Sequence, residues 1–202
     1  MKNIIFDLGG VILKGTPLSV LDKFNLNSND YEELKGFFID WKKLDLGIES
    51  LENKFNSCNY SNYIISNYKN ILINYYKLRD INFELIELIK KLKNNNYNVY
   101  ILSDNNKESD LYYRELELFN NIDGWILSCN YQKLKKDGLL FEILLNKYNL
   151  NPRECYFIDN TKDNIVIAGK YGIKGYLFNE NDDINNLYND MLNNEIKLSK
   201  KI

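Results

Sequence analysis

The stretch Asn3-Ile4-Ile5-Phe6-Asp7-Leu8-Gly9-Gly10-Val11 joins a short apolar run to a carboxylate and two glycines. The β-branched and aromatic residues of this run favour a strand, and the polar and glycine residues that follow favour a turn. We therefore predict a strand over residues 3–6, with Asp7 directly after it.

Four more runs of the same kind predict strands at residues 98–102, 124–127, 155–158 and 175–178. Longer stretches of helical period separate most of them. Short strands that alternate with helices are the pattern of βα units packed around a parallel sheet. The sequence therefore predicts an α/β fold with a parallel five-stranded sheet that is flanked by helices.

The predicted helices carry apolar residues on one face. One such face consists of Leu85, Ile86, Leu88, Ile89 and Leu92. Its N-cap is Asp80 or Asn82. A second face consists of Phe141, Leu144, Leu145 and Tyr148. We also expect a short helix over residues 164–171 that Gly172 closes, and a last helix over about 183–200 with lysines near its C-terminal end.

Residues 15–79 lack a strand signal, and their apolar residues recur at helical spacing. Examples are Leu34, Phe38 and Trp41, followed by Leu51 and Phe55. The simplest interpretation is an all-helical insertion between the first and second strands. We predict a core domain of residues 1–14 and 80–202, and a helical cap domain of residues 15–79.

The composition excludes several classes of function. The 202 residues include no histidine, which removes Ser-His-Asp triads, HExxH zinc sites and any imidazole base. A net charge of -2 provides no global positive field for nucleic acid or an anionic membrane. Three cysteines without CxxC spacing and no apolar run of about 20 residues favour a cytoplasmic protein with reduced thiols.

Polar residues follow the predicted strands. Asp7 follows the first, Ser103-Asp104-Asn105 the second and Asp159-Asn160 the fourth, while Lys135-Lys136 precedes a helix after the third. Ligands of parallel sheets bind beyond the carboxyl ends of the strands, so these groups should converge. Carboxylates there suit a divalent cation, and the amine and hydroxyl suit phosphoryl oxygens.

In these motifs the chain resembles the haloacid dehalogenase superfamily, and within it the phosphatase-like hydrolases with a helical cap after the first strand. The matching segments are Ile5-Phe6-Asp7-Leu8-Gly9-Gly10-Val11-Ile12, Ile101-Leu102-Ser103-Asp104-Asn105, Leu127-Ser128 through Lys135, and Phe157-Ile158-Asp159-Asn160. They occur in the family's order along nearly the whole chain. The resemblance implies a Rossmann-like core and a C1-type cap that carries the turn Leu46-Gly47-Ile48-Glu49.

The resemblance also implies catalytic roles. Asp7 would attack phosphorus and form an aspartyl-phosphate, Ser103 would donate a hydrogen bond to the phosphoryl group, and Lys135 would hold the phosphate and keep Asp7 ionised. Lys133 and Lys136 lie close enough in sequence to be alternatives to Lys135.

The implied cofactor is Mg²⁺. Its expected ligands are Asp7, Gly9, Asp159, Asn160 and Asp163. The expected phosphate-binding residues are Ser103, Asp104, Asn105, Lys135, Gly9 and Gly10. Asp163 has an alternative role as the N-cap of a helix.

Two positions depart from the family pattern. Where the family usually has a second Asp, which serves as general acid and base, this chain has Gly9; loss of such a group typically lowers rates by about 10²–10⁴-fold. Asn160 replaces a carboxylate, so we expect weaker metal binding. A phosphatase acting on a small phosphorylated metabolite is the favoured function. The alternative is a pseudoenzyme that keeps the fold as a binding or scaffolding module.

Overall fold

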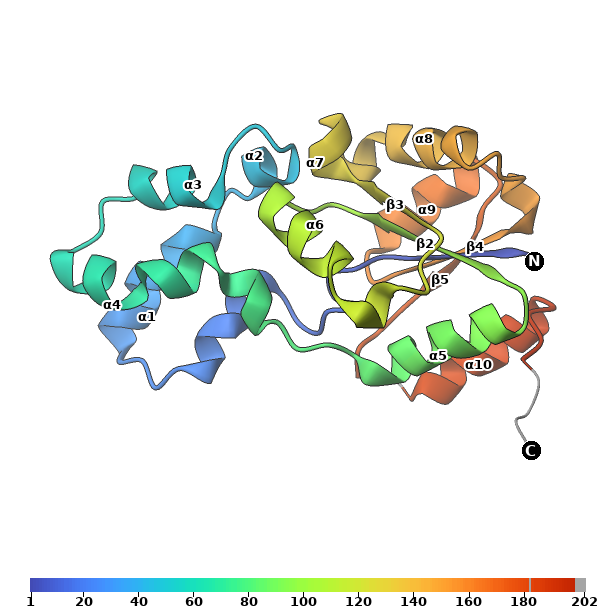
Figure 1. Ribbon diagram of the computed structural model, residues 1–202, viewed down its shortest axis with the longest axis horizontal. Helices are drawn as coiled ribbons and strands as arrows, with labels where there is room; N and C mark the ends of the chain where they lie inside the picture. Colours follow the sequence, from blue (N-terminus) through green and yellow to red (C-terminus); the bar gives the residue numbers. More distant parts are fainter. Residues whose placement is uncertain (182, 199–202) are drawn as a thin grey trace.

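Five parallel strands form one sheet in the spatial order β3-β2-β1-β4-β5, which confirms the predicted fold class (Figure 1). The strands are β1 (Asn3–Phe6), β2 (Asn98–Ser103), β3 (Gly124–Leu127), β4 (Cys155–Asp159) and β5 (Lys174–Leu177). The first strand of the chain is central, because it pairs with β2 on one side and β4 on the other. The computed structural model describes residues 1–181 and 183–198.

The strand ends refine the sequence prediction by one residue. β2 and β4 each continue one residue beyond the predicted end, because Ser103 pairs with Leu127 and Asp159 pairs with Leu177. β5 lies one residue earlier than predicted. Two polar site residues are therefore part of the ladder itself, so the sheet backbone determines where they lie.

Alternate side chains of the strands pack into two apolar layers. On β1, Ile4 and Phe6 belong to one layer and Ile5 to the other, as the two-residue period of a strand requires. Helices α5 (Phe83–Asn94) and α10 (Ile184–Asn193) cover the first layer. Helices α8 (Leu139–Lys147) and α9 (Lys162–Lys170) cover the second, on the opposite face (Figure 1).

Shorter elements follow the carboxyl ends of β2 and β3. The helices here are α6 (Lys107–Arg114) and α7 (Ser128–Tyr131), and the 3₁₀ turns of the core are η4 (Glu117–Phe119), η5 (Lys135–Asp137) and η6 (Pro152–Glu154). Turn η5 begins with the lysine that the sequence places in the site.

Most of the predicted helices are confirmed, with one correction. Asn82 caps α5, accepting a hydrogen bond from the Leu85 amide, and the five apolar residues predicted for this helix are buried. Helix α9 starts earlier than predicted, at Lys162. The last helix was predicted too long: α10 ends at Asn193, because Glu195 has a left-handed φ of 63° that interrupts the helix. Residues 199 and 200 of that prediction lie outside the described residues.

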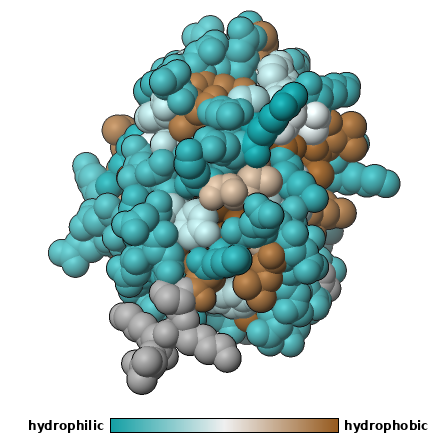
Figure 2. Space-filling view, turned by 90° about the vertical axis from the view of Figure 1, so that its right-hand side faces the viewer, coloured by the Kyte–Doolittle hydropathy of each residue, from teal (hydrophilic) through white to brown (hydrophobic). Residues whose placement is uncertain are grey.

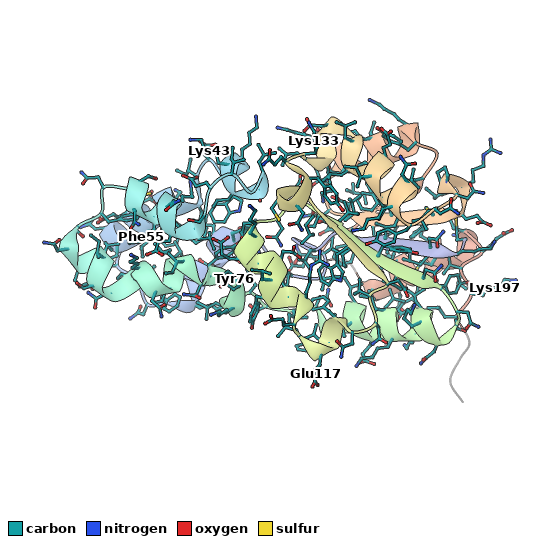
Figure 3. All side chains as sticks on the ribbon, turned by 45° about the horizontal axis from the view of Figure 1, so that its top comes forward. Lys43, Phe55, Tyr76, Glu117, Lys133 and Lys197 are labelled. Atoms are coloured by element: carbon teal, nitrogen blue, oxygen red, sulfur yellow. The ribbon has the colours of Figure 1, made fainter. Side chains whose placement is uncertain are left out.

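The inserted segment is helical, as predicted. Its elements are η1 (Pro17–Lys23), α1 (Ser28–Lys35), η2 (Gly36–Phe38), α2 (Lys42–Asp45), α3 (Leu51–Ser57), α4 (Asn62–Ile73) and η3 (Tyr75–Leu78). They enclose their own apolar cluster, which includes Phe37, Leu44 and Phe55. Figure 3 shows Phe55 among these helices and Tyr76 at the junction with the sheet. We call residues 15–79 the insert.

The two chain segments that join the insert to the sheet pair with each other. Leu13 forms an antiparallel bridge with Ile81, and the Lys14 amide donates to the Asp80 carbonyl at 2.8 Å. The Arg79 guanidinium donates to the carbonyls of three consecutive residues, at 3.1, 2.9 and 2.8 Å, namely Leu13, Lys14 and Gly15. The insert is therefore held at one double-stranded junction.

A second set of contacts holds the far side of the insert on the core. The Tyr75 hydroxyl accepts a hydrogen bond from Asn106 Nδ2 at 2.8 Å, and the Leu51 amide donates to Glu108 Oε1 at 3.0 Å. Gly47 lies against the core backbone: a Cβ at this position would lie 2.3 Å from the Cys129 carbonyl oxygen of α7. Only glycine fits there, so this turn of the insert touches the core backbone.

The surface opposite the insert is mostly hydrophilic, with scattered apolar side chains (Figure 2). Among the described residues, no helix is long and apolar enough to cross a membrane. Cys129 and Cys155 are buried, as expected of small apolar side chains, whereas Cys58 is half-buried; all three thiols are free.

Substitution of Gly47 tests the contact between insert and core. We expect Gly47→Ala to lower the free energy of unfolding by more than the roughly 1–2 kcal/mol that a left-handed φ costs an L-residue, because the Cys129 carbonyl also blocks the Cβ. Gly36→Ala is the matched control, since its φ is -56° and a Cβ would meet nothing within 4 Å. Urea unfolding of both variants measures the difference. Equal stability would contradict the close contact.

Candidate active site

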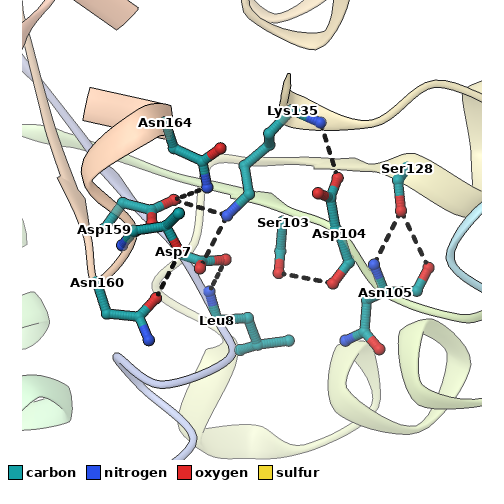
Figure 4. A network of polar contacts seen from close by, with 11 residues as sticks. Asp7, Leu8, Ser103, Asp104, Asn105, Ser128, Lys135, Asp159, Asn160 and Asn164 are labelled. Atoms are coloured by element: carbon teal, nitrogen blue, oxygen red, sulfur yellow. Dashed lines mark hydrogen bonds and ion pairs between the residues drawn. The ribbon is translucent and has the colours of Figure 1, made fainter. Parts of the chain in front are cut away.

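The carboxyl ends of β1, β2 and β4 bring most of the predicted site residues together (Figure 4). Asp7 follows β1, Ser103 ends β2 and Asp159 ends β4, while η5 supplies Lys135. All four side chains are buried. The sheet order therefore places side chains from four distant parts of the sequence around one point.

Lys135 connects the two carboxylates. Its Nζ lies 2.8 Å from Asp7 Oδ2 and 2.6 Å from Asp159 Oδ2. The other oxygen of Asp7 accepts a hydrogen bond from the Leu8 amide at 2.7 Å, which fixes the orientation of the carboxylate. We call Asp7, Lys135 and Asp159 the charged cluster.

Burial and charge oppose each other in this cluster. Burial raises the pKa of Asp7 to about 6, and the nearby Lys135 ammonium counteracts this rise. Burial lowers the pKa of Lys135, but the carboxylates of Asp7 and Asp159 outweigh it, so the pKa of Lys135 is raised. At neutral pH the lysine is charged and Asp7 is largely ionised, as a nucleophile requires.

The Asp159 carboxylate accepts hydrogen bonds from Lys135 and from two further donors. Its Oδ1 accepts from the Thr161 amide at 2.7 Å, and its Oδ2 accepts from Asn164 Nδ2 at 3.0 Å as well as from Lys135. The side chain is fully buried. Asp159 therefore positions Lys135, and both of its oxygens already have donors.

The segment after β2 presents polar groups to the same space. The Ser103 hydroxyl donates to the Asp104 carbonyl at 3.3 Å, and Asp104 Oδ1 accepts from the Lys135 amide at 2.9 Å. Burial raises the pKa of Asp104. The Asn105 amide donates to Ser128 Oγ at 2.9 Å. These bonds tie the ends of β2 and β3 to η5.

Two glycines after Asp7 have different surroundings. A Cβ on Gly9 would meet nothing within 4 Å, so the space beside this residue is open. Gly10 has a φ of +74°, and a Cβ there would lie 2.1 Å from Asn160 Nδ2. Gly10 therefore allows the Asn160 side chain to lie against the turn after β1.

A cavity of about 290 Å³ opens above the charged cluster. Its wall on the sheet side includes Asp7, Gly9, Ser103, Asp104, Asn105, Lys135 and Asn160. Its wall on the insert side includes Trp41, Asp45, Tyr75 and Arg79. The volume is that of a small-molecule site. The insert thus covers the strand ends and contributes polar groups of its own.

The structure shows which of the alternative residues offered by the sequence lie at the site. Lys135 is buried in the charged cluster, whereas Lys133 and Lys136 are exposed. Asp163 is not brought to the cavity wall: it lies exposed in the first turn of α9, and the next residue, Asn164, reaches Asp159 instead. Successive helical residues point about 100° apart, which accounts for the difference.

Sequence reasoning missed Asp45 and Arg79, and it included Asn164 in the fourth family motif without giving it a role. Asp45 directly precedes the Leu46-Gly47-Ile48 turn, which was recognised as a feature of the cap. Arg79 stands at the end of the predicted insert, where a junction is expected. The sequence marks both segments, but only the fold shows which of their side chains face the cavity.

The oxygen atoms at the cavity fit a magnesium ion that also binds phosphate. Among residues 1–181 and 183–198, no group of three or more His, Cys, Asp or Glu side chains is arranged to hold a metal. The Asp7 carboxylate, the backbone of Gly9 and the amide of Asn160 line the cavity. Mg²⁺ commonly binds through one or two carboxylates and completes its shell with water and substrate phosphate.

Comparison with known proteins gives a family match. A model of the haloacid dehalogenase-like hydrolase family matches residues 1–172. No curated protein matches the chain in sequence.

Solved structures share the fold at low sequence identity. A predicted hydrolase of this kind from Porphyromonas gingivalis is 22% identical over 95% of this chain and 98% of its own, with a TM-score of 0.66. A family enzyme from Bacteroides thetaiotaomicron, in complex with magnesium and inorganic phosphate, is 21% identical over 93% and 99%, with a TM-score of 0.69. The L-2-haloacid dehalogenase of Xanthobacter autotrophicus is 11% identical over 98% and 84%, with a TM-score of 0.65.

Removing the ammonium of Lys135 should destabilise the protein. Lys135→Met leaves Asp7 and Asp159 buried without their cation, and breaking a buried ion pair in this way costs about 3–5 kcal/mol. Lys136→Met, at an exposed neighbouring position, should change stability by less than about 0.5 kcal/mol. Chemical denaturation compares the two variants. A similar small effect for both would show that Lys135 does not hold the cluster together.

Proposed function

Because the chain belongs to the haloacid dehalogenase-like hydrolase family, we propose that it is a Mg²⁺-dependent phosphatase that hydrolyses a small phosphomonoester through an aspartyl-phosphate on Asp7. The observation that carries this proposal is the oriented, buried Asp7 carboxylate paired with Lys135 at the floor of a covered cavity. The magnesium and phosphate bound by the Bacteroides thetaiotaomicron enzyme support it.

The proposed reaction has two displacements at phosphorus. First, a carboxylate oxygen of Asp7 bonds to phosphorus, and the bond to the alcohol oxygen of the substrate breaks. Then a water oxygen bonds to phosphorus, and the bond to Asp7 breaks, which releases inorganic phosphate and restores the carboxylate. The positive charge of Lys135 keeps Asp7 ionised for the first step and attracts the phosphoryl oxygens.

The remaining polar groups would bind the phosphoryl group. Ser103, Asn105 and the backbone of Gly9 and Gly10 line the cavity beside Asp7, where hydroxyl and amide donors can reach phosphoryl oxygens. Asp7, Gly9 and Asn160 would hold Mg²⁺, which neutralises phosphate charge when bound. Asp159 takes part through Lys135, because both of its oxygens have donors.

The insert limits the size of the substrate. Trp41, Tyr75 and Arg79 line the cavity from the insert, and its volume of about 290 Å³ fits a small phosphorylated metabolite. We propose that residues 15–79 act as a cap domain that excludes water during the reaction.

Substitution of the nucleophile tests the proposal. We expect the purified protein to hydrolyse an aryl phosphate in the presence of Mg²⁺, and Asp7→Asn to lower the rate by at least about 10³-fold, because an amide cannot form the aspartyl-phosphate. Glu142→Gln, which removes an exposed carboxylate of the core, is the matched control and should keep full activity. Undiminished turnover by Asp7→Asn would refute the mechanism. No turnover by a folded, magnesium-loaded protein would favour the pseudoenzyme.

The metal dependence follows from the donor set. Because Asn160 contributes no charge, we expect weak Mg²⁺ binding to the free protein and stronger binding when inorganic phosphate is present. Asn160→Asp should increase the affinity for Mg²⁺ alone. Calorimetric titration with and without phosphate measures both effects. Equal Mg²⁺ affinities of the two proteins would exclude Asn160 from the metal site.

A further inference from the structure

The proposed reaction lacks a proton donor on the strand that carries the nucleophile. The alcohol oxygen needs a proton as its bond to phosphorus breaks, and the attacking water must lose one. Gly9 has no side chain, and the space beside it is open. Lys135 is committed to Asp7 and Asp159, so its ammonium is not free to deliver a proton. Another group at the cavity must move this proton.

A carboxyl group of the insert faces this space. Asp45 ends helix α2 and lines the cavity together with Asp7, Gly9 and Ser103. It lies two residues before Gly47, whose close approach to Cys129 brings this part of the insert against α7. Asp45 therefore belongs to a part of the cavity roof that contacts the core.

The Asp45 carboxyl is a free and partly buried group. Among the described residues, none forms a hydrogen bond or an ion pair with its side chain. Each charged group of the charged cluster, by contrast, has a partner within 3.0 Å. An unpartnered carboxyl that faces a reaction cavity is available to exchange a proton with a substrate.

The surroundings of Asp45 favour its neutral form. Burial raises the pKa of Asp45 to about 8, and the carboxylates of Asp104 and Asp7 add to this rise, while Lys135 opposes it. Tyr75 of η3 and Cys129 of α7 are the other titratable groups that interact with it. The carboxyl is therefore protonated at neutral pH, which is the state that a proton donor needs.

We propose that Asp45 is the general acid and base of this enzyme, supplied by the insert in place of a carboxylate at position 9. This inference rests on the phosphatase function proposed above. Among the described residues of the cavity roof, no other group combines an acidic proton with a free position, because the Tyr75 hydroxyl accepts from Asn106 and bonds to Ser109, and Arg79 donates to three carbonyls.

The proton transfers balance over one catalytic cycle. When the bond between phosphorus and the alcohol oxygen breaks, the Asp45 carboxyl gives its proton to that oxygen and the alcohol leaves. The resulting Asp45 carboxylate then takes a proton from the water whose oxygen bonds to phosphorus. As the bond to Asp7 breaks, phosphate is released and Asp45 is again protonated.

The test compares leaving groups. An alkoxide needs a proton to leave, whereas an aryl oxide with electron-withdrawing groups does not. We therefore expect Asp45→Asn to lower kcat/KM for an alkyl phosphate by about 10²–10⁴-fold. The same variant should lower kcat/KM for nitrophenyl phosphate by less than about 10-fold. Water activation is also lost, so nitrophenyl phosphate should give a burst of nitrophenol equal to the enzyme concentration, followed by slow turnover. In the wild type, kcat/KM for the alkyl phosphate should fall as the pH rises and Asp45 loses its proton. In Asp45→Asn, kcat/KM should not show this fall.

The control is Asp22→Asn, which removes an exposed carboxylate from the same insert and should leave both substrates unaffected. Asp45→Asn should fold at least as stably as the wild type at neutral pH, because the folded chain holds a proton on Asp45 that the unfolded chain releases. Equal losses of kcat/KM for the two substrates, or an alkyl phosphatase unchanged by Asp45→Asn, would overturn the inference. A wild type inactive on nitrophenyl phosphate would instead refute the proposed function.

Discussion

The buried ammonium of Lys135 is the constraint on which the rest of the site depends. Two carboxylates from different strands and one lysine from a turn leave water together, and each would be costly to bury alone. The cluster ties β1 and β4 to η5, and the bond from the Lys135 amide to Asp104 adds β2. The same ammonium that stabilises the strand ends favours the ionised form of Asp7, so in the proposed reaction stability and nucleophile activation would share one interaction.

The junction of the insert extends this arrangement to the roof of the cavity. Arg79 uses its guanidinium to hold the backbone of residues 13–15, which continue directly from the Gly9-Gly10 turn. The same residue lines the cavity. A movement of the insert about this junction would therefore change the contacts of the strand ends as well as the distance between Asp7 and Asp45. In the proposed reaction, opening of the site and the supply of its proton would thereby be connected through the backbone of one short segment.

The sequence predicted the sheet and its strand-end residues because both depend on local patterns. Short apolar runs determine the strands, and the parallel order determines that Asp7, Ser103 and Asp159 converge. The choice of Lys135 over its neighbours depends on which side of η5 turns inward, and a lysine-rich run carries no signal for that. Asn164 reaches Asp159 because its side chain leaves helix α9 on the side of the charged cluster, and the sequence does not show that direction. Asp45 is still harder to predict, because its surroundings arise from the contact between the insert and the core.

The division of labour between two carboxylates follows from their different surroundings. A nucleophile must be ionised at the pH at which the proton donor is still protonated, so the two groups need pKa values that lie apart. Asp7 has an ammonium at 2.8 Å and a backbone amide at 2.7 Å, and both favour its charged form. Asp45 is partly buried and has no such partner among the described residues, so desolvation favours its neutral form. A carboxyl group on the insert can thus stay neutral within the same cavity, and in the proposed reaction its place there rather than at position 9 would make proton transfer depend on a closed insert.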